Sequence, residues 1–289
     1  MGKHFVTRDL LLRELSRTPK ISVPAIAYFL LGVIIISCSS ILALKGYLPL
    51  WAGMIFNGFG LYLFFTIMHE SLHENVSSNK HLNDILGRIA LFFEIPFAPL
   101  ELARWIHLSH HGHTGCKKDP DNFMHHGKWW VLPLRWSNFD LYYAAHFVNN
   151  LMSGDKTAQR YASAVGVYVT LLFCLSIAII NFGYGLELFY LWFLSSRIGL
   201  GLVGFIFVFL PHHPAKISAH ENKYLATTVR RGHEWLLTPL MAYHNYHLIH
   251  HLYPSVPFYN YLKIWYLRYE ELTSKNPATQ TAFGLKPLN

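Results

Sequence analysis

The stretch His244–Tyr261, which reads HNYHLIHHLYPSVPFYNY, is the part of the chain around which the rest is organised. Within it, His247, His250 and His251 form the pattern H-x-x-H-H. Residues i and i+3 of a helix share a face and i+4 lies beside them, so the three imidazoles should point to one side. The adjacent pair diverges enough to serve two neighbouring centres. Because imidazole is the commonest metal ligand, the stretch indicates either a metal site or a histidine-rich surface turn.

Further histidine patterns lie upstream. H-E-S-L-H at 69–73 places two histidines at i and i+4 of one helical face, and H-L-S-H-H at 107–111 repeats the first pattern. His212 follows a proline at the end of an apolar run. Nine imidazoles are too many for one ion with four to six ligands, so they predict two ions. The candidate ligands are His69, His73, His107, His110, His111, His212, His247, His250 and His251.

The identity of the metal follows less directly from the residues. H-E-x-x-H at 69–73 also matches the helix of zinc proteases, in which Glu70 would be the base. A protease of that kind needs only one further ligand and leaves the other histidine patterns unexplained. Imidazole suits zinc, copper, iron and nickel. An all-nitrogen site for two ions beside lipid favours iron and redox chemistry with O2.

The composition indicates a membrane protein, because 52% of the 289 residues are hydrophobic and only 14% are charged. Arg197, which lies within an apolar segment, should face protein or water rather than lipid. We expect an all-α integral membrane protein with one domain over 1–289, four transmembrane helices and a helical cap that carries the histidines. The four segments long enough to cross about 30 Å of hydrocarbon are 23–44, 48–68, 161–182 and 188–210.

The distribution of charge predicts the orientation of these spans. Of the 24 Lys and Arg residues, 22 lie before the first span, between the second and third, or after the fourth. The side rich in Lys and Arg is normally the cytosol, so both termini and every candidate ligand should lie there. Ligands at the ends of the spans argue against a transporter, which would hold its ligands near mid-membrane. The net charge of +8 therefore fits a membrane surface better than nucleic acid.

Four strings carry a family resemblance: MHESLHENVSSNKHLNDILG (68–87), HLSHHGHTGCKKDPDNF (107–123), LPHHP (210–214) and NYHLIHHLYPSVPFYNY (245–261). They resemble the membrane fatty-acid desaturase superfamily and, within it, the cyanobacterial-type β-carotene hydroxylases. The resemblance implies a non-haem di-iron oxidase in which the eight histidines of the three boxes are ligands and His212 is the ninth. His213 stands where those hydroxylases have Arg and is left out. Glu70 and Ser71 replace the more frequent Asp and Ala, which leaves the substrate class open.

Other polar side chains are candidates for the surroundings of the ligands. Asp119 and Asp121 could accept the second N–H of ligand histidines, or they could be solvated acids of a proline turn. Asn245 could orient His247 or cap a turn. The remaining histidines are expected at the surface or around the ligands, and those considered are His113, His125, His126, His146, His220, His233 and His244.

The expected activity is an O2-dependent oxidation of an unactivated C–H bond in a lipid. Gly199–Gly204 matches G-x-G-x-x-G but lies in an apolar helix with no preceding strand, so no nicotinamide or flavin domain is expected. Electrons should come from an external donor, and the resemblance implies one of ferredoxin or cytochrome type. The resemblance favours ring hydroxylation of a carotenoid. Desaturation of an acyl lipid stays open, since the same ligands serve both reactions, and a membrane zinc protease is a further hypothesis.

Overall fold

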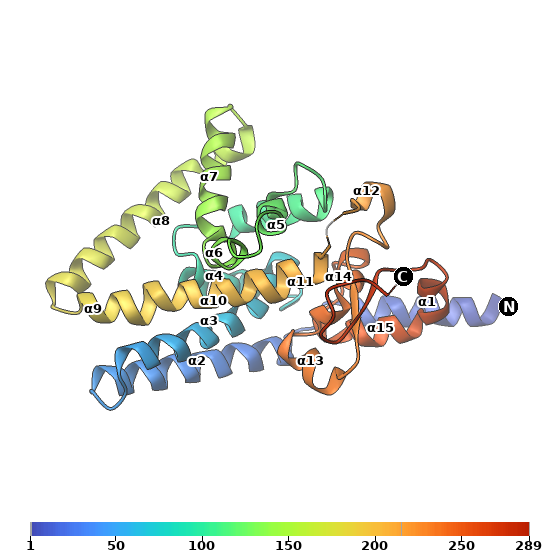
Figure 1. The fold of residues 1–289 in the computed structure, drawn as a ribbon, viewed down its shortest axis with the longest axis horizontal. Coiled ribbons are helices and arrows are strands. Elements are labelled where there is room, and N and C mark those ends of the chain that lie inside the picture. The colour runs from blue at the N-terminus through green and yellow to red at the C-terminus, as the bar shows by residue number, and fades with distance from the viewer. Residues whose placement is uncertain (1, 215, 289) are drawn as a thin grey trace.

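The computed structural model describes residues 2–214 and 216–288 and is almost entirely helical (Figure 1). Within the described residues, four helices are long and apolar enough to cross a membrane, which confirms the expected class. They are α2 (Val23–Leu44), α3 (Leu50–Leu72), α8 (Lys156–Asn181) and a continuous helix over Gly185–His212. The last is divided into α9 (Gly185–Leu188), η2 (Phe189–Leu194), α10 (Ser195–Val203), η3 (Gly204–Phe209) and α11 (Leu210–His212).

The ends of these helices follow local rules. Ser22 caps α2 by accepting a hydrogen bond from the Ala25 N–H, and a proline stands in the first turn. The second span, predicted over 48–68, continues to Leu72 and therefore includes His69 in its last turn. In the fourth span η2 and η3 are π-helical, and Pro211 lies two residues after the end of η3. A proline ring obstructs the carbonyl four residues earlier in a regular α-helix, which explains a wider turn at this point.

Helices α2, α3 and α10 form one packed layer (Figure 1). Glycines allow the close approach: a Cβ atom added to Gly199 would lie 2.8 Å from the Cβ atom of Leu61. This confirms that the glycines of 199–204 serve helix packing. The buried Asn57 amide ties the layer together by donating to the Leu191 carbonyl at 2.8 Å.

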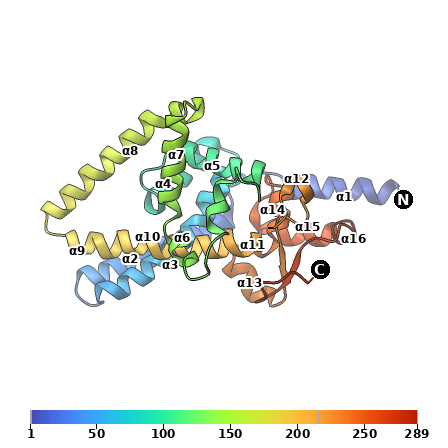
Figure 2. The same ribbon diagram turned by 45° about the horizontal axis from the view of Figure 1, so that its top comes forward.

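Helix α8 stands apart from that layer. In Figures 1 and 2 it runs obliquely away from α10 and joins α7 (Phe139–Met152) at one end and α9 at the other. Its apolar stretch has no buried residue in the isolated chain, so its surface is available to lipid on nearly all sides. Arg197 of α10 pairs with Asp140 of α7 through two contacts of 2.8 and 2.6 Å. The expectation that Arg197 faces protein is confirmed.

The remaining elements cover the histidine end of the bundle as a cap and extend along its side against α3 and α10 (Figure 1). Between the second and third spans lie α4 (Lys80–Glu94), α5 (Leu100–His113), η1 (Pro120–Met124), α6 (Leu132–Ser137) and α7. After the fourth span lie α12 (Ala219–Asn222), β1 (Val229–Arg231), α13 (Glu234–Leu240), η4 (His244–Tyr246), α14 (His247–Leu252), η5 (Phe258–Asn260), α15 (Tyr261–Leu267), α16 (Tyr269–Thr273) and β2 (Thr279–Thr281). Strands β1 and β2 pair in parallel, a feature that the sequence analysis lacked.

Both ends of the chain lie in this cap (Figure 1). Helix α1 (Gly2–Leu15) contacts the C-terminal helices through an ion pair of 2.7 Å between Asp9 and Arg268. The Asn260 amide donates to the Leu15 carbonyl at 2.9 Å. The turns between α2 and α3 and between α8 and α9 lie at the opposite end of the bundle. The cap thus gathers every segment that carries a candidate ligand.

Candidate metal centre

The nine histidines predicted as ligands converge from four separate segments: the end of α3, the helix α5, the end of α11 and the helix α14. Their ring nitrogens form two groups, in each of which one nitrogen per residue lies within 4.8 Å of all the others. The first group is His69, His73, His107 and His250. The second group is His110, His212, His247 and His251. His111 lies between them, grouped with His250 and His251.

The ring nitrogens within each group approach one another closely. The Nε2 atoms of His73 and His107 are 2.7 Å apart in the first group. In the second group the Nε2 atom of His251 lies 3.0 Å from that of His247 and 3.3 Å from that of His212. Imidazole lone pairs directed at one point are the donor set that a transition metal requires, with bonds of about 2.0–2.1 Å for zinc. The residues therefore fit two ions with nitrogen ligands.

The electrostatics of the cap favour the ligand form of these rings. The pKa of four of these rings lies well below its ordinary value, mainly because they are buried and secondly because other imidazoles surround them. The four are His107, His247, His250 and His251. Burial also lowers the pKa of His73 to about 3. A metal binds the unprotonated nitrogen of imidazole, so these rings can accept an ion without first losing a proton.

His110 has a different setting because two carboxylates face it. Its Nδ1 atom lies 2.8 Å from Asp119 Oδ1 and 3.4 Å from Asp121 Oδ2. Burial alone would lower the pKa of His110, but Asp121 and Asp119 outweigh it and raise the value to about 9. The carboxylates thus favour a positive charge, whether proton or metal, on the Nε2 side of the ring. Both aspartates are buried beside His110 rather than exposed to solvent.

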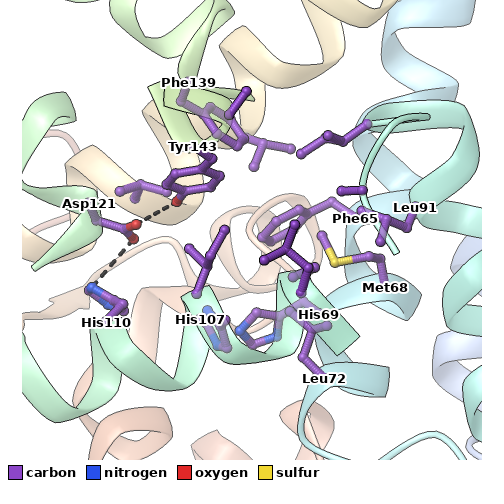
Figure 3. A pocket seen from close by; sticks show the side chains of 18 of the residues that line it. Phe65, Met68, His69, Leu72, Leu91, His107, His110, Asp121, Phe139 and Tyr143 are labelled. Atoms are coloured by element: carbon purple, nitrogen blue, oxygen red, sulfur yellow. Dashed lines mark hydrogen bonds and ion pairs between the residues drawn. The ribbon is translucent and has the colours of Figure 1, made fainter. Parts of the chain in front are cut away.

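Figure 3 shows that this contact extends to a tyrosine. The Tyr143 hydroxyl, from α7, donates to Asp121, which faces His110. Burial and the neighbouring Asp121 raise the pKa of Tyr143 well above its ordinary value, so the hydroxyl keeps its proton. Nothing in the sequence pattern around Tyr143 pointed to this role, because the residue lies 22 positions from Asp121 along the chain.

Other predicted ligands are oriented by neutral groups. His250 Nδ1 lies 2.8 Å from the Tyr261 hydroxyl, and His212 Nδ1 donates to the Val208 carbonyl at 2.8 Å. The Asn245 amide donates to Thr238 Oγ1 at 3.1 Å instead of contacting His247. Among the described residues, the Nδ1 atom of His247 has no hydrogen-bond partner, so the suggested orienting role of Asn245 is not seen.

Glu70 lies beside the first group, but its carboxylate is directed toward the backbone of Phe258. Its Oε2 atom accepts a hydrogen bond from the Phe258 N–H at 3.1 Å, which joins the end of α3 to the segment after α14. Its Oε1 atom is 3.6 Å from His69 Nδ1. The carboxylate is fully buried on the Nδ1 side of the His69 ring. This position suits support of a ligand better than activation of a water molecule.

A cavity of about 440 Å³ opens directly onto both groups. Figure 3 shows His69 and His107 at its floor and Tyr143 at one side. Its walls come from α3, α4, α5, α7, α8 and the fourth span, and its apolar lining includes Phe65, Met68, Leu91, Phe139, Phe147, Val203 and Phe207. A second cavity of about 430 Å³ shares Phe97, Leu141 and Leu172 with the first and reaches Arg197. Together they suit a long apolar molecule with one end at the histidines.

His244 is one of the histidines that the sequence analysis did not assign as ligands. It was expected at the surface or around the ligands, and the structure buries it to 1% exposure beside His69 and His247. The spacing of three residues from His247 in the opening stretch was the available signal. The residue does not share either four-nitrogen group, which separates it from the predicted ligands.

The class that these features define is a membrane protein in which a buried cluster of histidines, able to hold metal ions, faces an apolar cavity. The sequence matches the family model described as "Fatty acid desaturase" over residues 45–282. The chain therefore belongs to the fatty acid desaturase family, and it is a membrane oxidoreductase.

Two curated proteins of similar sequence are both β-carotene ketolases. A β-carotene ketolase of Paracoccus sp. (strain PC1) is 28% identical over 213 residues, which cover 72% of this chain and 74% of the relative. A β-carotene ketolase of Paracoccus sp. (strain N81106 / MBIC 01143) is 27% identical over 199 residues, covering 68% and 70%. Ketolation was not among the reactions considered from the sequence, which favoured hydroxylation.

Proposed function

We propose that this chain is a di-iron oxygenase of the membrane that oxidises an unactivated C–H bond on the ring of a carotenoid. The observation that carries the proposal is the meeting of two four-histidine groups at the end of an apolar cavity. The eight box histidines and His212 would hold two iron ions. Iron bound there would supply the activation of O2 that a saturated C–H bond requires.

The chain's own residues bind and orient the substrate. The aromatic and aliphatic walls of the cavity exclude water and hold an apolar ring against the histidine floor. Asp119, Asp121 and Tyr143 fix the orientation of His110, and Tyr261 fixes that of His250. Such outer contacts set the direction and basicity of a ligand ring.

The reaction requires two electrons from outside the chain. One hydroxylation converts C–H to C–OH with one O2, two electrons and two protons, and the second oxygen atom leaves as water. A second hydroxylation of the same carbon gives a geminal diol, which loses water to become a ketone. We infer an external donor of ferredoxin or cytochrome type, acting on the cytosolic side where the basic cap and both termini would lie.

The curated relatives favour two successive oxidations of the ring carbon, whereas the resemblance of the sequence strings favours one. The curated relatives are named as ketolases, whereas the sequence strings resemble hydroxylases. Both reactions begin with the same C–H bond, so the proposal covers both. Desaturation of an acyl lipid is the alternative within the family. A zinc protease is disfavoured, because Glu70 is engaged by the Phe258 N–H rather than facing the cavity.

Expression in cells that make β-carotene, followed by mass analysis of the extracted pigments and acyl lipids, tests the proposal. A gain of one oxygen atom means hydroxylation. A gain of one oxygen atom with a loss of two hydrogens means ketolation. Unchanged pigment together with acyl chains that have lost two hydrogens would refute the carotenoid substrate and establish the desaturase alternative. The same cells carrying a His73→Ala variant provide the background.

A further inference from the structure

The cavity contains few polar groups besides the predicted ligands. Among the described residues that line it, these are Asp121, Tyr143 and His244. Asp121 and Tyr143 satisfy each other, since the tyrosine hydroxyl donates to the carboxylate (Figure 3). His244 is the exception, and its chemistry is not used by the activity proposed above.

The hydrogen bonds of His244 determine which of its nitrogens carries a proton. Its Nδ1 atom lies 3.0 Å from the Ala242 carbonyl, and a carbonyl oxygen can only accept, so Nδ1 is the donor. In the neutral ring, Nε2 is then an acceptor with a free lone pair. That atom is buried and has no hydrogen-bond partner in the described part of the chain. A buried acceptor without a partner is unfavourable, which indicates a group that binds there.

The backbone holds this ring in place rather than leaving it free to turn. Ala242 and Tyr243, directly before it, both adopt the left-handed region, with φ values of 41° and 64°. Non-glycine residues seldom adopt that conformation, and such strain persists where the surrounding structure imposes it. The ring packs edge-on against Phe207 with centroids 4.6 Å apart. Because His244 also lines the cavity, the ring that carries the free nitrogen is a fixed part of the cavity wall.

The position of His244 places its acceptor next to the reacting end of the cavity. Its ring centroid is 4.9 Å from that of His69 in the first group and 5.3 Å from that of His247 in the second. It lies outside both four-nitrogen groups. A substrate carbon at the histidine floor would thus be within reach of His244, while the ring itself is not part of either ligand set.

We propose that His244 binds, through its free Nε2 atom, the hydroxyl group of an alcohol formed at the reacting carbon. The hydrocarbon substrate offers no donor to this nitrogen, whereas the product of a first hydroxylation does. An alcohol held in this way keeps its remaining C–H bond at the histidine floor instead of leaving. His244 would then be a specificity residue for a second oxidation of the same carbon. This inference rests on the proposed function for the oxidation itself.

The test is a competition for binding without turnover. Purified wild-type protein in lipid nanodiscs, kept without an electron donor, is given equal amounts of β-carotene and one of its ring alcohols, hydroxylated at C3 or at C4. The ratio of retained pigments is compared with that in empty nanodiscs. One hydrogen bond to a buried acceptor should favour at least one of the alcohols by about fivefold.

His244→Asn is the decisive variant, because its amide can still donate to the Ala242 carbonyl while the Nε2 acceptor is lost. In this variant the ratio of retained alcohol to retained β-carotene should lie within about twofold of the ratio in empty nanodiscs. The iron content should be unchanged. His244→Gln, which returns an oxygen near the Nε2 position, should recover part of it. His220→Asn, the same change at an exposed histidine of α12, is the matched control and should keep the preference.

Three results would overturn the assignment. One is an alcohol preference that survives in His244→Asn, and another is its loss in the control His220→Asn. The third is a fall in iron content in His244→Asn, which would make His244 a ligand. If the wild-type protein retains none of the pigments, the carotenoid substrate is wrong. The same competition between octadecane and octadecanol then decides whether His244 selects an alcohol.

Discussion

The two four-histidine groups have the same number of imidazoles but unlike surroundings. In the second group, His110 faces the carboxylates of Asp119 and Asp121. In the first group, the contact of His250 is the neutral hydroxyl of Tyr261, and the Glu70 carboxyl lies 3.6 Å from His69 Nδ1, beyond hydrogen-bond distance. A carboxylate on the far nitrogen makes an imidazole a stronger donor to a metal than a hydroxyl does. Two ions bound here would therefore be inequivalent, although the ligand atoms are of one kind.

The largest effect is expected from His250→Ala. His250 contributes to the first group and also lies with His111 and His251 beside the second, so its removal disturbs both. Activity should fall by more than about 100-fold, beyond the loss typical of an outer contact, and iron content should fall as well. Product analysis and metal analysis of the purified variant measure the two effects.

The control for this change is His220→Ala, which alters an exposed histidine of α12. It should keep activity and iron at the wild-type level. Activity of His250→Ala near that of His220→Ala would show that the first group is not part of the site.

His212→Ala should affect the second group alone. Three imidazoles of that group remain, so activity should fall by about 100-fold while iron content falls by at most about one ion per chain. The adjacent His213→Ala is the matched control, since His213 belongs to neither group. If His213→Ala proves the more damaging of the two, the ninth ligand has been misassigned.

Asp119→Asn tests the difference between the surroundings directly. The change keeps the size of the side chain but removes the charge that faces His110, so activity or iron affinity should fall about tenfold. Asp155→Asn is the control. Like Asp119, the Asp155 side chain accepts hydrogen bonds from two backbone N–H groups, but it does so at the start of α8, where it caps the helix. Iron titration of both variants supplies the measurement. Equal affinities would mean that the carboxylate does not distinguish the groups.

Tyr261→Phe should have the smallest effect of the four. It removes a neutral partner of His250 and leaves the ring packed, so a decrease in activity of about threefold is expected, in line with one neutral hydrogen bond. Tyr28→Phe, which loses a hydrogen bond to the Pro239 carbonyl away from the histidines, is the control. A loss as large as that of Asp119→Asn would remove the contrast between the two groups.

Much of this arrangement could be predicted from the sequence because it depends on local spacing. The first span is α2 as expected over 23–44, since uncharged length alone defines a membrane helix. The adjacent residues His250 and His251 diverge into different groups, as helical geometry requires. The second span extends to Leu72 because a helix does not end where the lipid ends.

The parts that could not be predicted depend on contacts between distant segments. Tyr143 meets Asp121, and Glu70 meets Phe258 across 188 residues, and neither contact has a local signature. His244 was within reach of prediction from its spacing, but its burial depends on the left-handed turn at Ala242 and Tyr243. The pairing of β1 with β2 joins two three-residue strands that are too short for periodicity to detect.

The π-helical turn η3 makes the position of His212 sensitive to the deletion of a single codon upstream of it. A π turn contains one residue more than an α turn, so η3 is equivalent to a one-codon insertion in a regular helix. Each residue of an α-helix rotates the chain by about 100°. Loss of one codon within 204–209 would therefore turn His212 away from its partners without changing any ligand. A homologue with the shorter helix would need its ninth ligand from another segment.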